Sequence, residues 1–210
     1  MKCSEICALI EQEYGTEYAC DWDNVGLLAG RSTKEVKKIL LSATDEVVRM
    51  AAEGGYDMLI THHPMLFSAI KRVTDQDMNG RRLLELIHND ISYYAMHTNY
   101  DTRGMADLAA RLMGLTEGAV LEEVKDGEGI GRVGKLPHPM TLRECGEQVK
   151  VAYGIPNVRL FGDSDTQVSL VGICPGAGKS TMPLALGFGC DVYITGDIDH
   201  HTGIDAVDQG

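Results

Sequence analysis

The sequence of 210 residues lacks any apolar stretch close to the ~20 residues that a membrane-spanning helix needs. Its first residues, MKCSEICALIEQ, also lack the apolar run of a signal peptide. None of its six cysteines forms a CxxC pair, so they are expected to be reduced thiols rather than a disulfide framework. These absences favour a cytoplasmic protein without membrane contact.

Basic residues are in short supply, because 19 Lys and Arg stand against 31 Asp and Glu and give a formal charge of -12. Binding to a phosphate backbone depends on Lys and Arg, so nucleic acid is an unlikely main partner. A small phosphorylated substrate stays possible, since a bound metal supplies local positive charge. The 44% of hydrophobic residues is ordinary for a globular protein and argues against disorder.

Segments with strand and helix patterns alternate along the chain. This alternation predicts an α/β fold with a largely parallel sheet, helices over it, and binding residues at the carboxyl ends of strands. The expected strands cover residues 37–45, 57–64, 91–96, 131–136, 158–163, 168–174 and 191–197. The expected helices cover residues 4–15, 45–55, 79–90, 105–115, 141–154, 178–189 and 200–210, and Thr141 with Glu144 forms a capping box.

The amino-acid composition becomes Gly-rich and acidic at residues 117–131, which indicates a domain boundary. We therefore expect one α/β unit over residues 1–124, carrying the segments THHP and HTNYD. A second α/β unit is expected over residues 125–210.

Histidines gather where expected strands end. His62 and His63 end one strand in THHP, and His97 with Asp101 follows the next in HTNYD. Imidazole with a carboxylate suits Zn, Fe, Mn or Ni. Pro64 favours an extended His63, so the two adjacent imidazoles are expected to point to opposite sides and to serve two ions. Two metals ~3.5–4 Å apart activate a bridging water for hydrolysis. The alternative is that the pair only caps the strand end by hydrogen bonds.

Two other segments invite a functional interpretation. GICPGAGKST resembles a phosphate-binding P-loop, but five residues instead of four separate its outer glycines, so a tight strand-to-helix turn is the better interpretation. In DWDNVGLLAG, Asp21, Asp23 and Asn24 surround Trp22. They form an acidic site or, as the stronger expectation, a loop with Asx turns.

Taken together, DWDNVGLLAG, THHPMLF, HTNYD and DVYITGDIDHH resemble the Nif-three-like dinuclear metal-centre family, some of whose members are labelled GTP cyclohydrolase 1 type 2. The resemblance implies that His62, His63 and Asp101 are ligands of two divalent metal ions and that His97 is a catalytic neighbour. It also implies two interlinked α/β units with mostly parallel or mixed sheets, assembled as a toroidal homohexamer.

One departure from the family pattern concerns the end of the chain. The family supplies further His and Glu ligands from a GHxxTE-like segment downstream of TGDIDHH, and this sequence ends before such a segment. A C-terminal strand and helix are therefore expected to be missing and the ligand set to be incomplete. His200 and His201 are not assigned to the missing roles.

Two functions fit these sequence features. The first is a metal-dependent hydrolase of a nucleotide-like or phosphorylated small molecule, including ring opening of the GTP cyclohydrolase type. The second is a non-catalytic metal-binding hexameric scaffold or regulator, in which the metals stabilise the assembly and partners bind outside it.

Overall fold

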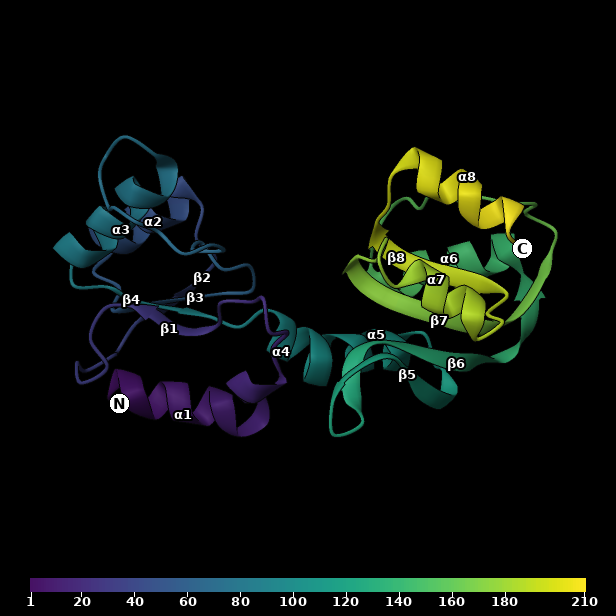
Figure 1. Ribbon diagram of the computed structural model, residues 1–210, viewed down its shortest axis with the longest axis horizontal. Helices are drawn as coiled ribbons and strands as arrows, with labels where there is room; N and C mark the ends of the chain where they lie inside the picture. The colour runs from purple at the N-terminus through teal and green to yellow at the C-terminus, as the bar shows by residue number, and fades with distance from the viewer. The chain divides into compact units, whose positions relative to one another are not determined.

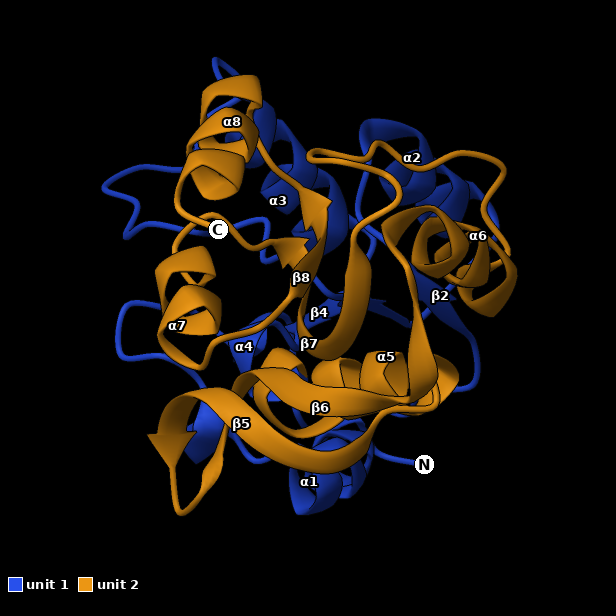
Figure 2. Ribbon diagram, turned by 90° about the vertical axis from the view of Figure 1, so that its right-hand side faces the viewer, with its two compact units in different colours: residues 1–100 blue, residues 101–210 orange.

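The computed structural model describes residues 1–210 and divides into two compact units, Met1–Tyr100 and Asp101–Gly210 (Figures 1 and 2). Each unit contains one four-stranded mixed sheet with helices. The α/β class with two units and mixed sheets is as the family resemblance implied, whereas the largely parallel sheet expected from the alternation is found in the first unit only. No helix combines the length and apolar character needed to cross a membrane.

The first unit is built on a sheet in the order β1-β4-β3-β2. Strands β2, β3 and β4 are parallel, and β1 is antiparallel to β4. Its elements are α1 (Cys3–Glu13), η1 (Thr16–Tyr18), β1 (Gly26–Ala29), β2 (Ile39–Leu41), α2 (Asp45–Glu53), β3 (Met58–Thr61), α3 (Met78–His88), β4 (Ser92–Ala95) and α4 (Thr98–Tyr100). Helices α2 and α3 cover one face of the sheet and α1 covers the other (Figure 1).

The two central strands of this sheet are buried on both faces. Leu59 and Tyr93 belong to the core under α2 and α3, whereas Met58 and Tyr94 belong to the core under α1. A strand with two buried faces has a continuous apolar sequence, as MLI and YYA do here. Because β3 and β4 pair in parallel, their carboxyl ends lie side by side in this buried part of the unit.

Helix α3 offers a direct test of packing in the first unit. Its first turn approaches the preceding loop so closely that a Cβ on Gly80 would lie 1.9 Å from the Thr74 carbonyl oxygen. Gly80→Ala is therefore expected to lower the free energy of unfolding by about 1–3 kcal/mol. Urea unfolding measures this. Gly187→Ala at the end of α7 is the matched control, because its Cβ would meet nothing within 4 Å, and it should leave stability unchanged or slightly raised.

The second unit contains a sheet in the order β5-β6-β7-β8, in which only β7 and β8 are parallel. Its elements are the π-helical turn η2 (Asp101–Met105), α5 (Ala106–Leu112), β5 (Thr116–Lys125), β6 (Glu128–Thr141), α6 (Leu142–Tyr153), β7 (Gln167–Ala177), α7 (Met182–Gly187), β8 (Val192–Asp197) and α8 (His200–Asp208). The capping box expected at the start of α6 is present: the Thr141 hydroxyl accepts from Glu144 N, and a Glu144 carboxylate oxygen accepts from Thr141 N.

The prediction of a strand at residues 158–163 is wrong. These residues run as irregular chain without a partner in the sheet. Their apolar side chains pack on α6 instead, where a Cβ on Gly146 would lie 2.9 Å from Leu160 and 3.4 Å from Val158. Gly162, at a φ of 105°, bends the chain before it could enter a ladder. The alternating pattern thus reflects contact with a helix.

The Gly-rich acidic stretch at residues 117–131 forms most of a β-hairpin. Strands β5 and β6 pair antiparallel, and Asp126 and Gly127 turn the chain with φ values of 53° and 78°. Such positive values explain the Asp-Gly sequence, since this dipeptide tolerates the left-handed conformation. The units of the structure divide at residues 100 and 101, whereas the sequence pattern placed the boundary at residues 124 and 125.

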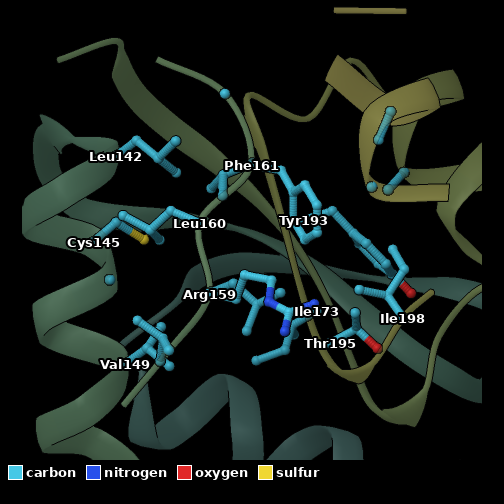
Figure 3. A pocket seen from close by; sticks show the side chains of 18 of the residues that line it. Leu142, Cys145, Val149, Arg159, Leu160, Phe161, Ile173, Tyr193, Thr195 and Ile198 are labelled. Carbon is cyan, nitrogen blue, oxygen red and sulfur yellow. The ribbon is translucent and has the colours of Figure 1, made fainter. Parts of the chain in front are cut away.

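A cavity of about 1010 Å³ lies within the second unit, beside α6, β7 and β8 (Figure 3). Leu142, Cys145 and Val149 project toward it from α6 and face Phe161 and Tyr193. Its walls are largely apolar, and the sequence patterns gave no sign of it.

Candidate metal centre

Three of the side chains singled out in the sequence come together in space. His62, His97 and Asp101 each offer one ligand atom, and these atoms lie within 4.8 Å of one another. Two imidazoles with one carboxylate form a donor set that suits a divalent transition metal. Asp101 follows Tyr100 without a break in the helical segment, so it stands four residues after His97 along the chain.

The segment that carries His62 and His63 is anchored directly after β3. The Thr61 hydroxyl donates to the His63 carbonyl at 3.0 Å, and the buried Tyr93 hydroxyl accepts from Met65 N at 2.6 Å. These bonds hold a bend instead of a continued strand. The position of the histidine pair is therefore set by β3 and β4 together.

The expectation that His62 and His63 point to opposite sides is wrong. Their ring centroids lie 4.7 Å apart, and each ring lies 5.1 Å from the ring of His97. Alternation of side chains holds only in extended strand, and β3 ends at Thr61 before the pair begins. Three imidazoles consequently converge on one region, with His97 buried, His62 half-buried and His63 exposed.

A buried carboxylate orients His97. Nδ1 of His97 lies 3.0 Å from Oδ1 of Asp23, whose side chain is fully buried. A histidine that donates its Nδ1 proton to a carboxylate keeps the Nε2 lone pair for a metal. With Nδ1 of His97 facing Asp23, Nε2 is the ring nitrogen that stays available to a metal ion.

The same carboxylate is held by the residue after His97. Thr98 donates its backbone N–H to Asp23 at 2.9 Å and its hydroxyl at 2.6 Å. Burial by itself raises the pKa of Asp23, but the hydrogen bonds from Thr98 and His97 outweigh it and hold the pKa below the usual value. Asp23 is therefore an ionised acceptor at neutral pH.

The turn that carries Asp101 is supported from within the second unit. Arg132 of β6 donates to the carbonyl oxygen of Thr102 at 3.2 Å and to the carboxylate of Asp107 at 2.6 Å. Arg132 is buried and also donates to two carbonyl oxygens of its own strand, at Gly129 and Gly131. One guanidinium thus ties β6 to the π-helical turn that starts at Asp101.

His62 and Asp101, expected as ligands, are both in the group of three, and His97, expected as a catalytic neighbour, is grouped with them. His63 lies beside the group. Sequence reasoning did not assign Asp23 to this centre, although its segment, DWDN, was singled out. His200 and His201 lie in α8 of the second unit.

The cavity of the second unit offers different chemistry. Arg159 is its only basic lining residue, and no histidine lines it. The grouped imidazoles and carboxylate are therefore the better candidate for hydrolytic chemistry.

Fold and site together define a mixed α/β protein of two units with a candidate divalent-metal centre of histidine and aspartate. The chain belongs to the Duf34/NIF3 (NGG1p interacting factor 3) family, whose model matches residues 1–210. It is 34% identical to the GTP cyclohydrolase 1 type 2 homolog of Clostridium perfringens over 216 aligned residues, which cover 100% of this chain and 82% of the relative.

Solved structures agree with this assignment. A hypothetical protein of Staphylococcus aureus matches with a TM-score of 0.86 at 29% identity, over 100% of this chain and 83% of that one. A Bacillus cereus protein related to NIF3 matches with a TM-score of 0.91 at 24% identity, over 100% of this chain and 86% of that one. The second likeness concerns the fold alone.

Proposed function

We propose that this protein is a divalent-metal-dependent hydrolase of a nucleotide-like or phosphorylated small molecule. The observation that carries the proposal is the convergence of the ligand atoms of His62, His97 and Asp101 within 4.8 Å. The name of the Clostridium perfringens relative, a GTP cyclohydrolase 1 type 2 homolog, supports a nucleotide substrate.

The residues fit a metal ion by their chemistry. His97 holds its proton at Nδ1 against Asp23 and offers Nε2, and Asp101 contributes a negative charge. A divalent cation held in this way supplies Lewis acidity, which polarises a carbonyl or phosphoryl group and makes water more acidic. Zn, Fe, Mn and Ni all suit this donor set.

We further propose two ions in each chain, with His63 as a ligand of the second. His63 is exposed, and its ring lies 4.7 Å from that of His62. An exposed imidazole beside the three grouped side chains is accessible to a second ion and to substrate. We also propose that the protein assembles as a homohexamer, as the family resemblance implies.

Elemental analysis of protein loaded with Mn or Zn tests this assignment. Because the ligand set is incomplete, the unchanged chain is expected to hold the ion of the three grouped side chains and to bind the second ion more weakly. His63→Ala is expected to lose the second ion, and His62→Ala to lose the ion of the three grouped ligands. His88→Ala, an exposed histidine of α3, is the matched control and should keep both ions. Absence of bound metal in the unchanged chain would end the proposal.

Hydrolysis is tested with the same variants against nucleotides and sugar phosphates in the presence of Mn or Zn. Turnover is expected to depend on metal and to disappear in His62→Ala, while light scattering finds the assembly unchanged. Two bound ions without turnover of any substrate would favour the metal-binding scaffold over the hydrolase.

A further inference from the structure

Two large aromatic side chains are exposed next to the metal centre. Trp22 is 58% exposed and Phe67 is 53% exposed, although both are large apolar residues. Their ring centroids lie 5.6 Å apart, with 36° between the ring planes. Two adjacent exposed aromatic rings form an apolar surface whose contact with water is unfavourable. Exposed apolar surfaces of this kind commonly mark binding sites.

Both rings contact the buried ligand His97. The centroid of Trp22 lies 6.0 Å from that of His97, and the centroid of Phe67 lies at the same distance. A molecule seated on the two exposed rings would therefore lie directly beside the imidazoles of the centre. The position suits the part of a substrate next to the reacting group.

The loops that carry the two rings are joined to each other. The Asn24 side-chain amide donates to the carbonyl oxygen of Leu66 at 2.7 Å, so the chain next to Trp22 is linked to the residue before Phe67. Leu66 is buried in the core of the first unit and anchors the loop that carries Phe67. The two loops that carry the rings are thus linked directly, without a ligand between them.

The first of these loops is also attached to the chain around His97. Cys20 N donates to the Thr98 hydroxyl at 2.8 Å, and the buried Asp23 carboxylate accepts from Thr98 and His97. Trp22 stands between these two anchored residues. Preorganisation of this kind lowers the entropy cost of binding.

From these observations we propose that Trp22 and Phe67 are specificity-determining residues that stack a planar heteroaromatic ring, such as a purine base, of the substrate. This rests on the proposed function, because the ring is taken to belong to the molecule hydrolysed at the metal centre. Every base has a π face that stacks on aromatic side chains, whereas a sugar phosphate without a base has none. The surface therefore selects nucleotide-like molecules over other phosphorylated molecules.

Trp22 reports on this directly, since it is the only tryptophan of the chain. Guanosine, GMP and ribose 5-phosphate are titrated into the full chain while its tryptophan fluorescence is followed, with free tryptophan as the optical control. Guanosine and GMP are expected to quench the fluorescence, and ribose 5-phosphate is expected to leave it unchanged. Equal responses to GMP and ribose 5-phosphate would overturn the proposal.

Variants separate stacking from other effects. Phe67→Leu keeps an apolar side chain and the reporter, and is expected to weaken guanosine and GMP binding about tenfold or more. Phe188→Leu, at an aromatic residue that is 47% exposed in the second unit, is the matched control and should bind as the unchanged chain does. Unchanged affinity in Phe67→Leu, or a change of oligomeric state in that variant, would overturn the proposal in favour of a non-specific or subunit-contact role.

The experiments distinguish failure of the stacking surface from failure of the proposed hydrolase. Base binding that depends on Phe67 in protein that turns over nothing would support the stacking surface and contradict the hydrolase. Metal-dependent hydrolysis of a phosphorylated molecule without a ring, equally fast in Phe67→Leu, would support the hydrolase and overturn the stacking surface.

Discussion

Asp23→Ala is expected to lower the affinity for divalent metal about 10- to 100-fold, because loss of a carboxylate behind a ligating histidine has effects of this size. Without Asp23, nothing fixes the Nδ1 proton and ring orientation of His97, whose Nδ1 lies 3.0 Å from Oδ1 of the carboxylate. Competition titration with a metal-sensitive dye measures the affinity. An affinity equal to that of the unchanged chain would remove Asp23 from the centre.

The same variant should also destabilise the first unit. The N–H and hydroxyl of Thr98 would lose their acceptor in a buried environment, at a cost of about 2–4 kcal/mol. Asp21→Ala is the matched control, an exposed carboxylate in the same loop, and should leave both stability and metal affinity unchanged.

Acid unfolding adds a second readout for Asp23. Because the folded state holds the pKa of this carboxyl below its usual value, its contribution to stability is present above pH ~4 and is lost as the pH falls further. Asp23→Ala should lack that component, so its stability should fall less steeply with acid than that of the unchanged chain.

Arg132→Met is expected to destabilise the second unit by about 2–4 kcal/mol. The substitution keeps an apolar stem of similar length and leaves the carbonyl oxygens of Thr102, Gly129 and Gly131 without the donor that they share. Urea unfolding followed by far-ultraviolet circular dichroism measures the loss.

A neighbouring cation on the same strand provides the control for Arg132. Lys135 pairs with Glu117 across β5 and β6, and both side chains are more than half exposed. Lys135→Met should therefore change stability by about 0.5 kcal/mol or less. Equal effects of the two substitutions would mean that the buried hydrogen bonds of Arg132 do not support the unit.

The sequence predicted the helices and strands whose formation depends on local sequence patterns. The helix at 45–55 and the strand at 57–64 were expected from periodicity, and both are present in shortened form as α2 and β3. The segment 158–163 failed because its alternating apolar residues meet a helix and find no sheet partner, which depends on the fold as a whole. Strands β1 and β5 were missed because Gly-rich and acidic sequence masks them.

The candidate site likewise contains residues that the sequence pattern predicted and one, Asp23, that it did not. The parallel pairing of β3 and β4 brings their carboxyl ends together, so the sequence indicated that His62 and Asp101 would meet. Asp23 lies 74 residues before His97, and its burial beneath that ring follows from the packing of the loop after η1. No local pattern distinguishes such a carboxylate from one in an ordinary Asx turn.

The π-helical turn Asp101–Met105 sets the orientation of α5 relative to Asp101. A turn of this kind contains one residue more than an α-helical turn, and one residue corresponds to about 100° of rotation about a helix axis. Deleting Gly104 would restore α-helical winding and rotate α5 by about that angle relative to Asp101. A frame-preserving loss of one glycine would thus displace α5 from its packing against β6 while leaving Asp101 four residues after His97.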